Sequence, residues 1–121
     1  MSTATEELAP ERWVEYFDSI AGRIDGQLVT IELMSDQLGD QTDVEHLPLR
    51  AIGYDHKDDV LEVSVGGQHP RYPVVLRHFI SGPQTISIEA ADPLTPRAIL
   101  VTDASGVRTL IRLFEPAALE S

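Results

Sequence analysis

Apolar side chains recur at helical spacing near the start of the chain, and Pro10 suits the first turn of a helix because this turn leaves its amide groups unpaired. The stripe consists of Trp13, Phe17, Ile20 and Ile24. It predicts one amphipathic helix that begins at Pro10 and ends near Gly22, with its apolar face on a larger structure and Trp13 in the core.

From Gln27 onwards the hydrophobic period changes to two, which is typical of strands with one buried face. The expected strands are 27–33, 47–54, 60–65, 84–90, 97–102 and 107–114. The turns at 55–59 and 103–106 predict two hairpins. We expect a polar connection over 35–46, and residues 68–83, where prolines surround an apolar cluster, fit either a helical turn or a bent strand.

One helix followed by about six short strands joined by tight turns predicts an α+β fold. We expect a strongly twisted, mostly antiparallel sheet with the N-terminal helix packed on it, and a partly open barrel is the variant. The chain is expected to form a single domain over 1–121, with 1–8 disordered and an ordered core over about 9–115.

The acidic residues are concentrated in one half of the chain. Residues 1–62 hold 15 Asp and Glu against four Lys and Arg, whereas residues 63–121 hold five of each, and the net charge is -11. We expect an acidic surface unless the fold interleaves the halves. This balance argues against nucleic-acid and membrane partners, which require clustered basic residues.

The chain has no Cys, and no segment resembles an export signal or a membrane anchor. These features predict a cytoplasmic protein without disulfides or thiolate metal sites. No phosphate-binding loop is present, and Gly66-Gly67 is expected to be a turn. We therefore expect no cofactor.

The densest polar cluster follows Tyr54, and its candidate metal ligands are Asp55, His56, Asp58 and Asp59. Adjacent side chains on a tight turn diverge, and all of these residue types are common at turn tips. The cluster is therefore expected to be a solvated turn rather than a metal site.

His78 is the strongest of the weak catalytic candidates, with Asp55 second. The four histidines are His46, His56, His69 and His78, and no two have a spacing that would place them on one face as metal ligands. His78 lies in an apolar cluster, where an imidazole needs a backbone or carboxylate partner. No serine has the surroundings of a nucleophile, so the sequence disfavours an enzyme.

The last expected strand carries a mixed surface. Arg108, Leu110, Arg112 and Phe114 share one face. Two charges beside two large apolar groups favour contact with another part of the fold, an acidic partner or a second copy of the chain. We expect the last hairpin to be a possible edge for self-association.

Four short motifs together resemble a family of small, single-domain microbial proteins of unknown function. They are W-x-x-x-F-D from Trp13, Y-D-x-x-D-D-x-L-E-V from Tyr54, H-x-I-x-x-P-x-x-I from His78 and D-x-x-G-x-R-T-L from Asp103. The stretch 68–75, with Pro70 and Pro73, departs from this pattern. The resemblance implies an α+β fold and brings no catalytic residues.

Two functions remain open. The first is a non-enzymatic accessory or protein- or ligand-binding module with an acidic surface. The alternative is a small enzyme or small-molecule-binding domain with a pocket near His78, in which Asp55 or another carboxylate orients the ring. An Sm-like RNA-binding barrel fits the order of elements but conflicts with the charge.

Overall fold

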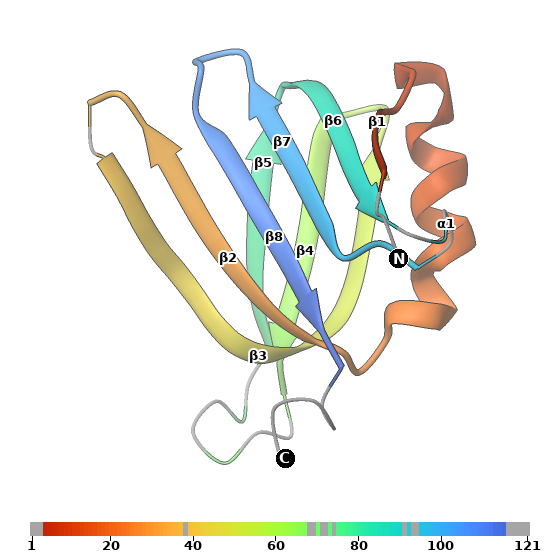
Figure 1. Cartoon of the computed structure of the whole chain (residues 1–121), viewed down its shortest axis with the longest axis vertical. Helices are drawn as coiled ribbons and strands as arrows, with labels where there is room; N and C mark the ends of the chain where they lie inside the picture. Colours follow the sequence, from red (N-terminus) through yellow and green to blue (C-terminus); the bar gives the residue numbers. More distant parts are fainter. Residues whose placement is uncertain are drawn as a thin grey trace.

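The computed structural model describes residues 4–37, 39–67, 70, 73, 75–90, 92 and 95–115. These residues form an α+β fold with one short α-helix and one large antiparallel sheet (Figure 1). The helical elements are η1 (Pro10–Arg12) and α1 (Trp13–Ile24). The strands are β1 (Ala4–Glu7), β2 (Leu28–Ser35), β3 (Gly39–Asp55), β4 (Val60–Gly66), β5 (Val75–Ser81), β6 (Pro83–Ala90), β7 (Ala98–Asp103) and β8 (Arg108–Phe114).

The sheet bends around β3. Its strand order is β1-β6-β7-β8-β2-β3-β4-β5, and every pair is antiparallel. The first part of β3 pairs with β2, up to Pro48, and the part from Leu49 pairs with β4. Figure 1 shows the result, with β4 and β5 behind the layer of β2, β8 and β7. The sheet is not closed, and its two edges are β1 and β5.

The hydrophobic core fills the space between the two layers of the bent sheet. Inward residues of β2, β8 and β7 belong to one buried cluster with those of β4, and Ile31, Ile111 and Val63 in it are fully buried. Helix α1 closes one side (Figure 1) and buries Tyr16 together with the stripe seen in the sequence, which is Trp13, Phe17, Ile20 and Ile24. The placement of Trp13 in the core is confirmed, since it is only 4% exposed.

The helix boundaries differ from those expected. Pro10 opens a 3-10 turn, the α-helix starts at Trp13, and Gly22 lies inside it. Gly26, which lies after the end of the helix, has a positive φ of 87°. The helix continues past Gly22 because Ile24, at 1% exposure, completes the buried stripe.

The expected number of strands was too low. The hairpins β3–β4 and β7–β8 are confirmed by their pairing. However, residues 39–46, expected as a polar connection, form the first part of β3. Residues 75–81 form β5, so the bent-strand alternative holds there, while most of 68–74 lies outside the described residues.

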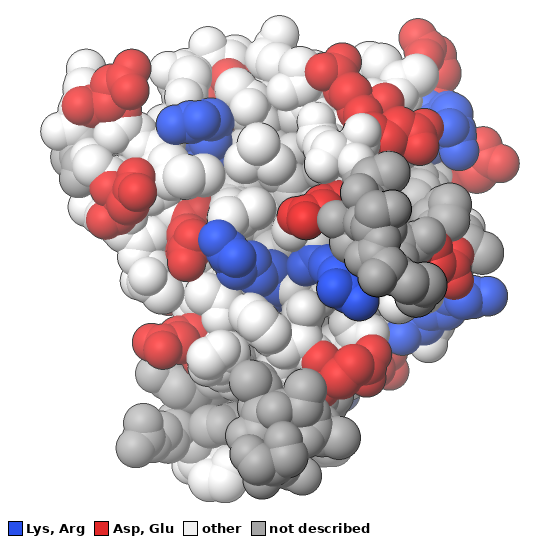
Figure 2. All heavy atoms as spheres, viewed as in Figure 1, with Lys and Arg blue, Asp and Glu red and all other residues white. Residues whose placement is uncertain are grey.

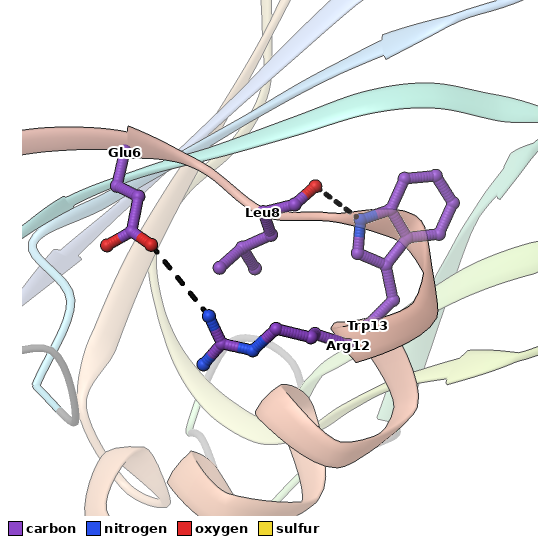
Figure 3. Close-up of polar contacts among 4 residues, drawn as sticks. All are labelled: Glu6, Leu8, Arg12 and Trp13. Atoms are coloured by element: carbon purple, nitrogen blue, oxygen red, sulfur yellow. Dashed lines mark hydrogen bonds and ion pairs between the residues drawn. The ribbon is translucent and has the colours of Figure 1, made fainter.

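The N-terminal segment forms strand β1 from Ala4, within the residues for which the sequence predicts disorder. The amide of Leu8 donates to the carbonyl of Ile86 at 2.8 Å, which continues the pairing of β1 with β6. The indole Nε1–H of Trp13 donates to the carbonyl of Leu8 at 3.2 Å, and a guanidinium nitrogen of Arg12 lies 3.8 Å from a carboxylate oxygen of Glu6 (Figure 3). These contacts fasten β1 to the start of α1.

Candidate functional site

The edge strand β5 carries most of the large hydrophobic side chains that are exposed among the described residues. Their exposed large hydrophobic side chains are Val14 at 37%, Val75 at 46%, Leu76 at 40% and Phe79 at 55%. Three of these four belong to β5, which pairs with β4 on one side and ends the sheet on the other. Natural sheet edges are usually protected by charge, proline or covering chain, so an apolar edge indicates a binding surface.

An acidic groove crosses the outer face of β3 and β4 and ends at this edge. Its volume is about 530 Å³, and its lining includes Asp18 of α1 at one end and Phe79 of β5 at the other. Gly53, Glu62 and Phe79 occupy one row across three strands. Gly53 leaves the groove open, since a Cβ atom there would have no neighbour within 4 Å.

The β3–β4 turn borders the groove and is held by its own side chains. An Asp55 carboxylate oxygen accepts the amides of Lys57 and Asp58 at 2.9 and 3.3 Å. The Tyr54 hydroxyl donates to Asp59 at 2.6 Å. This hydrogen bond raises the pKa of Tyr54 to about 12, with smaller contributions from burial and from the Asp59 and Asp55 charges.

These contacts give the carboxylates of the turn a local structural role. The described residues contain no group of three His, Asp or Glu side chains arranged to hold a metal ion. The candidate ligands Asp55, His56, Asp58 and Asp59 thus do not converge. Tyr54 also packs edge-on against Trp13, with ring centroids 5.0 Å apart, so the turn is coupled to the helix.

His78 has a carboxylate partner, but it is not Asp55. Its Nδ1 lies 3.1 Å from an oxygen of Asp43, in the first part of β3. A cavity of about 490 Å³ is lined by His78 together with Leu33 of β2 and residues of the β7–β8 turn. With Nδ1 donating to Asp43, Nε2 is the ring nitrogen left to contact a ligand.

The face of β8 predicted as an interaction surface exists, but it does not lie at an edge. Arg108, Leu110, Arg112 and Phe114 alternate with buried residues along β8, which lies between β7 and β2. Arg112 lies 3.8 Å from Glu32, and Phe114 packs against His46 with ring centroids 5.1 Å apart. Both strands of this hairpin are paired on both sides, β7 with β6 and β8 with β2, so the described residues of the hairpin present an outer face rather than a sheet edge.

The fold interleaves the two halves of the chain, so the acidic half does not form one separate face. In the sheet, β6, β7 and β8 of the second half lie between β1 and β2 of the first. Figure 2 shows basic groups in the middle of one face, with acidic groups around them. The groove beside β4 is an exception, since Asp18, Asp55, Asp58 and Glu62 line it without any Lys or Arg.

Sequence reasoning missed two residues of these sites. Phe79 was grouped with an apolar cluster, and only the sheet order shows that its strand is an edge. Asp43 lies in 35–46, which the sequence predicts as a polar connection, and this segment shows little of the alternation that marks a strand. His56 lies in the β3–β4 turn, and His69 lies outside the described residues.

The fold and these surfaces define a small α+β protein built on an open, bent antiparallel sheet. The chain belongs to DUF5335, a family of unknown function, whose model matches residues 4–121. An uncharacterised protein of Aquifex aeolicus (strain VF5) is 33% identical over 110 residues, which span 91% of this chain and 92% of the relative. The family resemblance seen in the sequence is thus confirmed.

No solved structure matches the chain. Among the described residues, no helix has both the length and the apolar character needed to cross a membrane.

Proposed function

We propose that the protein is a non-enzymatic protein-binding module that adds an extended segment of a partner to the free edge of β5. The observation that carries this proposal is the concentration of exposed Val75, Leu76 and Phe79 on an edge strand. Strand addition satisfies the unpaired backbone groups of an edge, and side chains on alternate positions provide specificity. We also propose that the chain acts as a single domain in the cytoplasm.

The acidic groove supports a partner with positive charge. It meets the edge at Phe79, and its carboxylates have no basic neighbour in the groove lining. Opposite charges across an interface increase the association rate and exclude wrong partners. A nucleic acid is a poor candidate for the same surface, because its phosphates would meet these carboxylates.

Selection from a display library of short random peptides tests the binding function. We expect peptides to be enriched that bind the wild-type protein and shift the amide resonances of β5 in NMR spectra. Phe79→Glu places a charge on the edge and should weaken their binding by about tenfold or more. Val14→Glu is the matched control, because Val14 is the exposed hydrophobic that lies away from the edge. Equal binding to Phe79→Glu and wild type would refute the proposal.

The contact between His78 and Asp43 favours a second candidate function, the binding of a small molecule in the adjacent cavity. His78 is the one side chain in its lining that can carry a positive charge. The lining otherwise combines apolar groups with the hydroxyls of Ser81, Ser105 and Thr109, and its one carboxylate, Asp103, accepts hydrogen bonds within the β7–β8 turn. Such a site suits an uncharged ligand with an apolar body and a hydrogen-bond donor for Nε2.

Phenol and anisole are suitable probes for this cavity because they differ in the hydroxyl donor. We expect phenol, titrated in NMR experiments, to shift the amides of β5 and of the β7–β8 turn more than anisole does. His78→Phe should remove the difference between the two probes. If both probes shift the same resonances equally in the wild-type protein, His78 does not form a binding site of this kind.

A further inference from the structure

The two sides of β5 have different surroundings, and a strand added to its edge would meet both. We infer that the partner segment is an amphipathic strand, an inference that rests on the proposed function. Its apolar side chains face the space between the two sheet layers, and a Lys or Arg on its other side lies opposite Phe79. The surroundings of the two sides of β5 thus determine which side of the partner strand is apolar and which carries the positive charge.

The inner side of β5 consists of Leu76, His78 and Ile80, which pair with the core residues of β4. Leu76 remains 40% exposed although it is on this inner side, so the core is open at the edge. Further along the same side of β5, His78 and Ile80 line a cavity that reaches Leu33 of β2. Apolar side chains of an added strand would enter this space and cover Leu76.

The layer that contains β2 and the first part of β3 also limits what can pair with the edge of β5. The contact of Asp43 with His78 brings the first part of β3 over the inner side of β5. In Figure 1, β2 and this part of β3 lie further out than β5, on the side of its free edge. A single extended strand needs less room beside β5 than a second copy paired edge to edge, which would bring its own β2–β3 layer into the same space.

The outer side of β5 favours a basic residue. Phe79 lies beside Glu62 of β4, which lies beside Gly53 of β3. A residue opposite Phe79 on an added strand would be about 5 Å from β5 and about 10 Å from β4. A Lys or Arg stem can lie along the exposed ring, with the cation over its face, and reach the Glu62 carboxylate.

Arg77 limits the positions at which the partner strand can carry its basic residue. It is on the same outer side, two residues before Phe79, and faces Ser64 of β4 rather than a carboxylate. A basic residue opposite Arg77 would be repelled, since like charges on facing strands are destabilising. The favoured segment therefore carries its basic residue opposite Phe79 and a neutral or acidic residue opposite Arg77.

Matched synthetic peptides test this inference. One alternates valine and threonine and has a single central lysine among its polar positions. The second has glutamate in place of this lysine, and the third has the composition of the first in an order without alternation. Each is titrated into wild-type, Glu62→Gln and Val14→Ala proteins, with β5 amide shifts as the readout.

We expect the lysine peptide to bind about fivefold to tenfold more tightly than the glutamate peptide and the unalternated peptide. This preference over glutamate should fall to about twofold or less in Glu62→Gln and persist in Val14→Ala, which separates a charge effect from altered folding. Equal binding of the lysine and glutamate peptides would overturn the inferred chemistry and leave strand addition intact. If neither these peptides nor any display-selected peptide shifts the β5 resonances, both the inference and the proposed function fail.

Discussion

At the scale of single residues, the hydrogen bond from Tyr54 to Asp59 has a measurable consequence at alkaline pH. The pKa of Tyr54 is raised from 10.0 to about 12, and the largest cause is the hydrogen bond that the protonated hydroxyl donates to Asp59. A raised folded-state pKa stabilises the fold fully below the unfolded pKa, and this contribution is lost as the pH rises from 10 to about 12. We predict that Asp59→Asn lowers the Tyr54 pKa towards 10 and reduces the loss of stability between pH 10 and about 12, because the folded-state and unfolded-state pKa values of Tyr54 then nearly coincide.

The measurement is an NMR titration of the tyrosine ring carbons, combined with urea unfolding across the same pH range. Asp58→Asn is the matched control, because Asp58 lies next in the chain but does not contact the hydroxyl. An Asp59→Asn protein whose Tyr54 titrates as in the wild type would show that the hydrogen bond is not the cause of the shift.

At the scale of elements, two glycines near the end of α1 should respond to alanine in opposite directions. Gly22 lies inside the helix, and a Cβ atom there meets nothing within 4 Å. Gly22→Ala should raise the free energy of unfolding by about 0.5–1 kcal/mol, because glycine has the larger entropy to lose. Gly26 has a φ of 87°, which is unfavourable for alanine, so Gly26→Ala should lower the free energy of unfolding by about 1 kcal/mol or more.

Urea denaturation of both variants measures these changes. Each variant is the control for the other, since the residues are close in the chain and both have open space for a methyl group. Destabilisation by Gly22→Ala would indicate that the helix does not continue through this residue in solution.

An element can be predicted from the sequence when its own residues carry the periodicity or the turn pattern that forms it. The stripe of α1 and the two hairpins carry their own periodicity and turn residues, and these predictions were confirmed. The first part of β3 is mostly exposed, so its residues show little alternation of buried and solvent-facing types. It is a strand because β2 pairs with it, and that information lies elsewhere in the chain.

The same reasoning explains what the sequence showed of the candidate sites at the scale of the whole molecule. A backbone or carboxylate partner for His78 followed from general rules for buried imidazoles, but neither its kind nor its identity did. Asp43 reaches His78 only because β3 bends and places its first part opposite β5. Likewise Phe79 is exposed because the strand order ends at β5, and strand order has no signature in a local sequence pattern.

The net charge of -11 is also a property of the whole molecule, and it should make the fold more stable in salt. Among the described residues, three pairs of arginine and carboxylate groups each have a nitrogen–oxygen distance of 3.8 Å, and exposed pairs of this kind contribute between zero and about 1 kcal/mol. Repulsion among the remaining carboxylates is therefore the larger effect. It acts over about 30 Å at 10 mM salt and about 10 Å at 100 mM.

We predict that raising NaCl from 10 to 300 mM increases the free energy of unfolding by about 1 kcal/mol, because screening relieves repulsion in the compact state. Urea denaturation at each salt concentration measures the change, and KCl at equal ionic strength should give the same result. The double variant Asp18→Asn with Asp58→Asn removes two carboxylates from the groove lining. It should be more stable than the wild type at 10 mM NaCl and respond less to salt. A fall in stability with salt would mean instead that attractive pairs dominate the surface, and that the groove carboxylates are balanced by charges outside its lining.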